Sequence, residues 1–415
     1  FAPRLGFAYQ PFGSGKTVIR GSWGLFYDTP PLSSIVANTG PPNGGAAGVH
    51  ANPGGPEPVL NINLTPGTPT QILPGQAIFG TANPTPPFGA FGVSQDFRIA
   101  YVQNYNFNIQ QQLGNGTIFQ TGYVGSTGRK LGLLRNINAP IPGTTGTIQS
   151  RRPYLSQFPT TSDINMLESI GNSQYNSWQN SLRVTRFKNV MLNANYTWSR
   201  QMDNGTDVRN ALPANSYDLR REYGPGAIDL AHIFTGYVAY EIPTFTNRAK
   251  RLLGGWQLGS LFQATTGTPI DILAGVVRSN SGDNRDRVDV IGSPVVGVQD
   301  PTIPGGARRY FSAANFALPA IGTFGNIGRN ALRGPGFVAT DFSILKRTAI
   351  TERIKTEFRA EIFNLFNRAN FANPGTSLNA ATSFGLITNT RNGSGAPGLG
   401  QGEPRNIQLA LKLIW

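Results

Sequence analysis

Hydrophobic and polar residues alternate along the last eleven residues of the chain, 405–415. Every second position is apolar, and these positions are Ile407, Leu409, Leu411, Leu413 and Trp415. Successive side chains of a β-strand point to opposite faces, so one face of this segment is wholly apolar and the other is mostly polar or small. A strand between lipid and a water-filled lumen has this pattern. The end of the chain therefore predicts a membrane-spanning strand.

Two-residue alternation recurs in eleven segments, each about as long as a tilted strand needs to cross the hydrocarbon layer. The segments are residues 3–10, 17–27, 103–113, 117–126, 176–186, 190–200, 232–242, 256–266, 339–347, 355–366 and 405–415. Short connections alternate with long ones, and the long ones are residues 28–102, 127–175, 201–231, 267–338 and 367–404. Outer-membrane barrels keep short turns on one side and long loops on the other. The pattern predicts an all-β fold, a transmembrane antiparallel up-and-down β-barrel.

The tryptophans follow the same pattern. All five fall in predicted strands on the apolar face, and they are Trp23, Trp178, Trp198, Trp256 and Trp415. The alternation of connections puts the first three near the long loops and the last two near the short turns. Two aromatic girdles at the membrane surfaces would have this arrangement. The alternative is that these residues are buried in the core of a soluble β-sandwich.

Several charged residues in the predicted strands lie on the opposite face. Those that we expect to face the lumen are Arg20, Arg183, Glu357, Arg359, Glu361 and Lys412. On the lipid face such a charge would cost ~2–4 kcal/mol near the middle of the membrane. Their position therefore agrees with the predicted register. For each of them we favour mutual neutralisation in a wet interior over contact with a plug or a solute.

Composition narrows the possible classes of protein. The 415 residues include no cysteine, which excludes disulfides and thiolate metal sites. No apolar run reaches the ~18 residues of a transmembrane helix, so only strands could cross a bilayer. The net charge of +14 is spread along the chain without a basic helix or a nucleic-acid motif. We expect no nucleic-acid partner, and a mild preference for an anionic solute or for lipopolysaccharide phosphates.

Residues with catalytic chemistry are few. The two histidines, His50 and His232, lie outside any nucleophile-elbow motif. The glycine-rich segments 322–336 and 393–402 lack the lysine and the strand-to-helix context of a phosphate-binding loop, so we interpret them as flexible surface loops. The sequence predicts that the protein is not an enzyme and uses no cofactor.

One cluster of carboxylates is a weak candidate for a metal site. Asp283, Asp286 and Asp289 lie close together in the sequence, and calcium prefers clustered oxygen ligands. Their spacing is not that of an EF-hand, and Arg285 and Arg287 lie among them. We therefore favour a solvated loop with local ion pairs over a calcium site.

Several segments carry a resemblance to a known family. They are residues 1–9, 17–28, 123–131, 196–199, 255–258, 322–336 and 358–367. In this order they resemble barrel strands and a loop of TonB-dependent outer-membrane receptors, most closely the Oar-like branch. The last of them, 358–367, is similar to the penultimate-strand motif of these receptors. The resemblance covers almost the whole chain apart from the loop at about 30–97.

The resemblance implies that residues 1–415 are the C-terminal half of a 22-stranded barrel with a plug inside. The chain starts at Phe1 without an initiator methionine or a signal segment, so we expect a signal peptide, an N-terminal domain and the plug upstream. It also implies uptake or export of a solute across the outer membrane, with energy from TonB reaching the protein through the N-terminal part. Trp415 would be read by the barrel assembly machinery. Long loops would be extracellular and short turns periplasmic.

Other functions remain open at this stage. A passive porin-like channel would share the strands but lack a plug and a TonB box. A secreted all-β adhesin or glycan-binding protein would be recovered without detergent. Exposed loops could also serve phages or protein toxins as a receptor, as a secondary role. The solute is not predicted, because the loops carry no distinctive chemistry.

Overall fold

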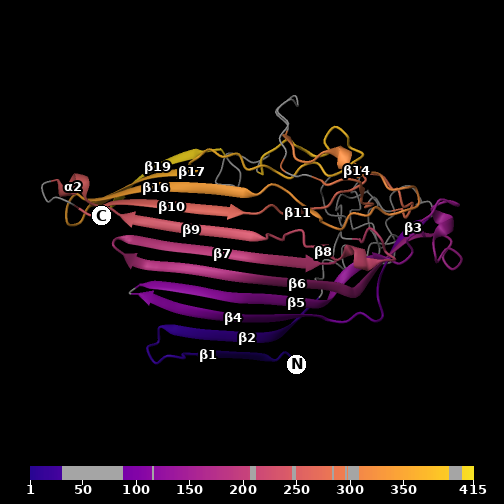
Figure 1. Cartoon of the computed structure of the whole chain (residues 1–415), viewed down its shortest axis with the longest axis horizontal. Coiled ribbons are helices and arrows are strands. Elements are labelled where there is room, and N and C mark those ends of the chain that lie inside the picture. Colours follow the sequence, from indigo (N-terminus) through magenta and orange to yellow (C-terminus); the bar gives the residue numbers. More distant parts are fainter. Residues whose placement is uncertain are drawn as a thin grey trace, which may run out of the picture.

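The computed structural model describes residues 1–29, 87–114, 116–205, 212–244, 249–282, 285–294, 297, 308–391 and 404–415. Figure 1 shows one large curved sheet with irregular segments gathered at one end. In the described residues its long strands are β1 (Arg4–Tyr9), β2 (Thr17–Asp28), β4 (Ala100–Gly114), β5 (Thr117–Asn136), β6 (Thr161–Phe187), β7 (Val190–Asp203), β9 (His232–Glu241), β10 (Trp256–Thr265), β16 (Phe337–Ala349), β17 (Lys355–Phe363) and β19 (Asn406–Ile414).

The strand order in the sheet follows the order along the chain. Each long strand pairs antiparallel with the next, from β1 to β19, as expected for an up-and-down barrel. Short turns lie at the left end in Figure 1 and long connections at the right. All eleven segments predicted from alternation are confirmed as strands of this sheet. Within the described residues, β1 and β19 form its two edges and do not pair with each other.

Helices contribute little to the part of the chain that the structure describes. One short helix, α2 (Lys250–Leu253), lies in the connection between β9 and β10. Single 3₁₀ turns occur in the longer connections, at Gln149–Arg151, Leu219–Glu222 and Ala313–Asn315. No helix in the described ranges is long and apolar enough to cross a membrane.

The strands β5 and β6 continue well beyond the predicted segments. Their pairing passes two register shifts after Gly128 and goes on to Asn136, opposite Asn165. The short strand β3 (Phe88–Val93) then pairs in parallel with the first part of β6. Leu133 and Leu167 are almost fully buried in this extension. Alternation missed these parts because each register shift interrupts the two-residue period.

The described parts of the connections after β7, β10 and β17 are folded, including residues 322–336, for which we expected a flexible loop. The other glycine-rich segment, 393–402, lies outside the described residues. Pairs of short strands join distant segments: β11 (Pro269–Ile270) with β15 (Leu332–Arg333), β12 (Asp289–Val290) with β14 (Phe316–Ala317), and β13 (Arg308–Arg309) with β18 (Leu386–Ile387). A further short strand, β8 (Gly224–Pro225), pairs with the end of β7. We name the described parts of the β7–β9, β10–β16 and β17–β19 connections the loop cap.

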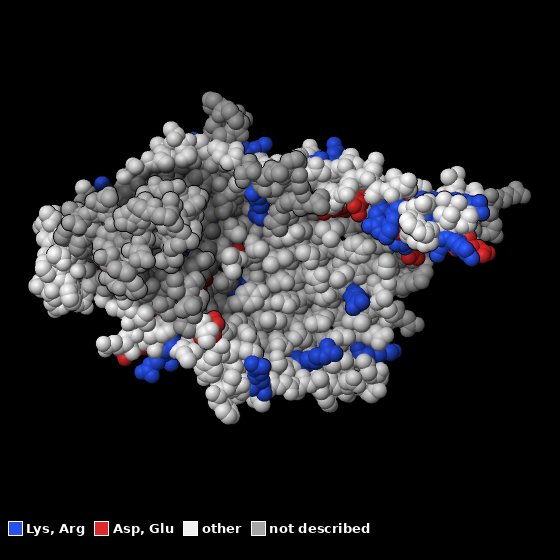
Figure 2. Space-filling model, turned by 180° about the vertical axis from the view of Figure 1, so that it is seen from behind, with Lys and Arg blue, Asp and Glu red and all other residues white. Residues whose placement is uncertain are grey.

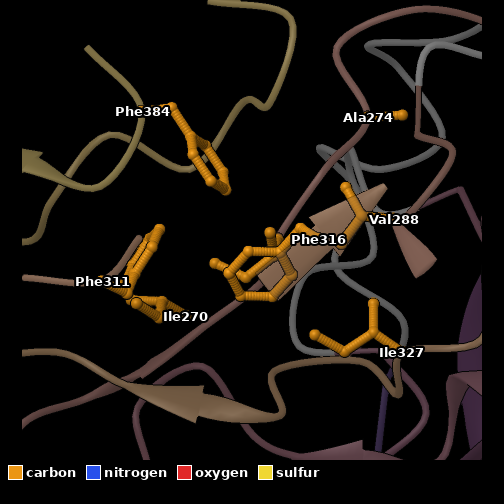
Figure 3. Packing of buried hydrophobic residues seen from close by; sticks show 8 residues of the cluster. Ile270, Ala274, Val288, Phe311, Phe316, Ile327 and Phe384 are labelled. Carbon is orange, nitrogen blue, oxygen red and sulfur yellow. The ribbon is translucent and has the colours of Figure 1, made fainter. Parts of the chain in front are cut away.

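The loop cap has a hydrophobic core of its own (Figure 3). Its buried members are Ile270, Ile272, Ala274, Val288, Phe311, Phe316, Ile327 and Phe384. The centre of the Phe311 ring lies 5.1 Å from the centre of the Phe384 ring and 5.8 Å from that of the Phe316 ring. Both pairs of rings meet edge to face. Ile327, in the glycine-rich segment, is only 7% exposed. The expectation of a flexible surface loop at 322–336 is therefore wrong, because its apolar side chains help to bury this core.

The apolar face of the sheet lies on the molecular surface. Leu5, Phe107, Leu409 and Leu411 are between 46% and 75% exposed. A β-sandwich would bury such rows between two stacked sheets. Trp178, at 49% exposed, also belongs to this surface. The sandwich interpretation of the tryptophans does not fit these exposures, whereas a lipid-facing surface does.

Candidate functional site

The register brings the predicted charged residues to one face of the sheet. Directly opposed residues of antiparallel strands point to the same side. Following these pairs from β2 to β19 gives a single polar face that carries Arg20, Arg183, Glu357, Arg359, Glu361 and Lys412. Amide and hydroxyl side chains, such as Asn108, Gln179 and Thr197, lie between them. That this face lines a lumen stays a prediction.

Charges are unevenly spread over the molecule. Figure 2 shows the back of the view in Figure 1, with few charged side chains over the middle of the sheet. A group of both signs lies at the short-turn end. Along the register, the polar face consists mainly of uncharged hydrogen-bonding groups, and ionic groups such as Glu357 and Arg359 lie close together.

The best-defined cluster on the polar face surrounds Glu357. Its Oε2 accepts a hydrogen bond from Arg347 Nε at 2.8 Å, and its Oε1 accepts one from Arg359 Nε at 2.7 Å. Lys412 lies directly opposite on β19. Glu357 is only 6% exposed, but the two arginine side chains are 62% and 47% exposed. One carboxylate thus faces three cations, so the cluster keeps an excess of positive charge.

A small hollow lies beside this cluster on the polar face. It has a volume of about 190 Å³, and its lining includes Tyr237, Gln257, Ser343, Arg359 and Glu361. Phenol, amide, hydroxyl, guanidinium and carboxylate groups can all hydrogen-bond a polar solute or water. Such a lining supports binding contacts with a polar solute.

Arg347 was not among the residues predicted to face the lumen. It follows Ser343 and Leu345 on the same face of β16. The signal was present in the sequence, because the alternation of residues 339–347 gives Arg347 the polar side. Its importance comes from the pairing with β17, which a single sequence does not reveal.

The candidate metal ligands do not meet in a common site among the described residues. Asp286 is fully buried, and its carboxylate accepts hydrogen bonds from the backbone N–H groups of Arg278 and Ser279, at 2.5 Å each. Asp289 accepts a bond from the Asn326 N–H at 2.8 Å, and Asp283 lies outside the described residues. No three His, Cys, Asp or Glu side chains of the described ranges could hold an ion together. The expectation of a solvated loop is wrong for Asp286, because its buried carboxylate is hydrogen-bonded to the backbone of the loop.

A buried network of charged side chains lies in the loop cap. Arg287, 8% exposed, donates two hydrogen bonds to Glu222, at 3.0 and 2.7 Å, and its Nε donates to Asp271 at 2.9 Å. Burial lowers the pKa of Arg287, but the hydrogen bonds and charges of the two carboxylates outweigh burial and raise it. Glu222 belongs to the β7–β9 connection, and the other two belong to the β10–β16 connection. This network therefore joins two connections into one unit.

Of two further ion pairs, one attaches the loop cap to the sheet and the other joins two connections within the cap. Arg329 donates to the buried carboxylate of Asp203, at the end of β7, at 2.6 Å. Arg333 pairs with the buried Asp229. Sequence reasoning missed these pairs because the partners are 126 and 104 positions apart. The cap is thus fixed to β7, and its β10–β16 connection is fixed to its β7–β9 connection.

Of the two histidines, His232 lies in the described residues and contacts a tyrosine. The Nδ1 atom of His232 lies 2.8 Å from the hydroxyl of Tyr196, on the neighbouring strand. His50 lies outside the described residues. The tryptophans occupy two levels of the sheet: Trp178 opposes Trp198, which in turn opposes His232 at the loop end of β9, whereas Trp256 opens β10 at the turn end.

The two predicted girdles can be tested by fluorescence. In variants that keep one tryptophan each and carry phenylalanine at the others, we expect Trp198 and Trp256 both to be quenched most by lipids brominated near the headgroup, because amphipathic rings prefer that depth. The measurement is quenching in vesicles as a function of bromine position. Strongest quenching by lipids brominated at the ends of their acyl chains would contradict the girdles.

Comparisons with known proteins agree with this geometry. A family model described as an outer membrane beta barrel domain matches residues 1–408. The outer membrane transporter YddB from Escherichia coli is similar in structure, with a TM-score of 0.52 and 10% identity, over 100% of this chain and 40% of YddB. The FrpB iron transporter from Neisseria meningitidis has a TM-score of 0.45 and 12% identity, over 100% of this chain and 39% of FrpB. No curated protein matches the sequence. The chain thus spans about two fifths of the length of YddB, and at this identity the likeness concerns the fold.

Proposed function

We propose, from the premise that this chain belongs to the outer membrane β-barrel domain family, that it forms the barrel part of a TonB-dependent transporter or receptor of the Oar-like branch. The family and the exposed apolar face give the protein an outer-membrane location. That location does not fit a secreted adhesin. In the proposed function, a solute crosses along the polar face with energy that TonB delivers through a part of the protein outside this chain.

One observation carries the proposal beyond a generic barrel. The long connections of β7, β10 and β17 form a loop cap with its own core and buried ion pairs. A simple channel needs only an open mouth, but a receptor needs a shaped surface at the end where solute arrives. The segments that resemble TonB-dependent receptors, including 358–367 in and after β17, point the same way.

The proposal includes an orientation and partners. The loop cap is extracellular, where lipopolysaccharide surrounds the barrel, and the short turns are periplasmic. Trp415 then lies at the periplasmic end and serves as the residue that the barrel assembly machinery reads. The basic excess around Glu357 favours an anionic solute, because Arg347, Arg359 and Lys412 outnumber the two carboxylates, Glu357 and Glu361.

Electrical recording distinguishes the proposed transporter from a passive channel. We expect the natural full-length protein, inserted in a planar bilayer, to pass no steady current, because a plug would close the barrel. A variant that lacks only the plug and keeps every barrel strand should conduct. A large, steady, ohmic current through the full-length protein would instead identify a porin-like channel and refute the TonB-dependent function.

A further inference from the structure

The connection between β9 and β10 presents apolar side chains to the surroundings. It carries the short helix α2, which projects at the short-turn end of the sheet in Figure 1. Leu252 and Leu253, which end this helix, are 69% and 49% exposed. Single exposed leucines are common on protein surfaces, but two adjacent ones preceded by Lys250 and Arg251 form an amphipathic segment.

Side chains from the apolar face hold this connection in place. The indole Nε1 of Trp256 donates a hydrogen bond to the carbonyl oxygen of Leu252 at 2.9 Å. The Nζ of Lys346 donates to the carbonyl oxygen of Gly254 and lies 5.1 Å from the centre of the Trp256 ring. Trp256 and Lys346 oppose each other on the outward face of β10 and β16. The end of α2 is therefore fixed to the outward side of the sheet.

The backbone of the connection depends on a glycine at its end. Gly255 has a φ of 75°, a left-handed conformation that favours glycine. A Cβ atom there would lie 2.2 Å from the carbonyl oxygen of Arg347. The close approach of these two segments places α2 beside the turn between β16 and β17. One open groove of about 1110 Å³ lies between the two turns, and its lining includes Leu252, Ile350 and Glu352.

The exposed leucines continue the lipid-facing surface of the sheet. The register runs from Trp256 through Lys346 and Phe358 to Leu411, which is 75% exposed. Trp415 follows at the same end of the sheet and is 87% exposed. An apolar surface that reaches the level of aromatic and basic residues is characteristic of the boundary between hydrocarbon and headgroups.

We propose that α2 is an interfacial membrane anchor. Leu252 and Leu253 enter the edge of the hydrocarbon layer, and the exposed Arg251 contacts the phosphate groups of anionic phospholipids in the leaflet at the short-turn end. Lys346 and Trp256 act as positioning residues that hold the anchor against the outward face. The inference rests on the outer-membrane location of the family and goes beyond transport, so it survives if the TonB-dependent function fails.

Spin labelling tests the insertion. The chain has no cysteine, so Leu252→Cys gives a single labelling position within it. In the full-length protein reconstituted in vesicles of phosphatidylcholine and phosphatidylglycerol, we expect the nitroxide at 252 to be severalfold more accessible to oxygen than to a water-soluble nickel complex. A label at Glu352→Cys, on the neighbouring turn, is the control and should show the opposite preference. Equal accessibilities at the two positions would overturn the anchor.

Lipid composition tests the headgroup contact. Removal of phosphatidylglycerol should move the label at 252 toward water. In the Arg251→Gln variant the depth of the label should no longer depend on phosphatidylglycerol, although the label should remain accessible to oxygen. Added inorganic phosphate should have no effect, because free phosphate cannot replace a lipid phosphate held at the membrane surface. A label depth that ignores phosphatidylglycerol in the unchanged protein would refute the role of Arg251.

Discussion

Replacement of Arg287 by methionine is expected to unfold the loop cap and leave the sheet intact. The substitution removes the cation that pairs with the carboxylates of Glu222 and Asp271. The side chain of Glu222 is only 5% exposed. Breaking a buried ion pair from one side costs about 3–5 kcal/mol, because a buried charge remains uncompensated. Hydrogen exchange read by mass spectrometry should show lost protection in the connections around 222 and 271, with protection retained in the strands.

A matched surface substitution controls for the loss of an arginine. Arg220 is 99% exposed and lies 4.0 Å from Asp218, in the same connection as Glu222. Because exposed pairs contribute roughly 0–1 kcal/mol, Arg220→Met should leave exchange unchanged. Adding Glu222→Gln to Arg287→Met should restore part of the protection, since it removes one uncompensated charge. Identical exchange in Arg287→Met and the unchanged protein would show that the network does not hold the cap.

An arginine at Val238 is expected to block insertion or destabilise the inserted sheet. Val238 lies on the outward face of β9, opposite Leu192 and Ser260, and is 37% exposed. A charged residue on the lipid face costs ~2–4 kcal/mol near the middle of the membrane. Urea titration in lipid vesicles, followed by tryptophan fluorescence, should show this loss, together with a lower yield of folded protein.

The adjacent residue provides the control for this prediction. Tyr237 is on the same strand but belongs to the polar face, where it lines the hollow with Gln257 and Arg359. Tyr237→Arg adds the same charge to a wet surface, so we expect a free energy of unfolding within about 0.5 kcal/mol of the unchanged protein. A similar loss in both variants would mean that the two faces do not differ in their surroundings, and the assignment of the lipid face would fail.

Alternation was sufficient to predict the eleven long strands of the sheet, but not β3, β8 or the far parts of β5 and β6. In each strand of a membrane barrel, alternate residues face lipid and water. The pattern that identifies a strand is therefore contained in the sequence of that strand alone. The segment 405–415 illustrates this, because its period alone predicted β19. The extension of β5 and β6 was missed because its pairing depends on register shifts and on partners such as Leu133 and Leu167.

The candidate site was predicted only in part. The alternation in the sequence placed Glu357, Arg359 and Lys412 on the polar face. It did not reveal that Glu357 lies between two arginines and accepts hydrogen bonds from both. Arg287 was recognised only as a charge beside a weak metal candidate, and its partner Glu222 lies 65 positions away. Contacts of this range follow from how whole loops pack, which no local pattern encodes.

The apolar rows on the outward face have a consequence for how the protein can diverge. Their neighbours are fluid acyl chains, which fill any space that a shorter side chain leaves, so no cavity penalty applies there. Leu411 can become valine or phenylalanine at little cost, provided that the residue stays apolar. Phe311 in the loop cap has fixed ring partners and lacks this freedom. Apolar residues on the outward face of the sheet can therefore be exchanged in evolution far more freely than those in the core of the loop cap.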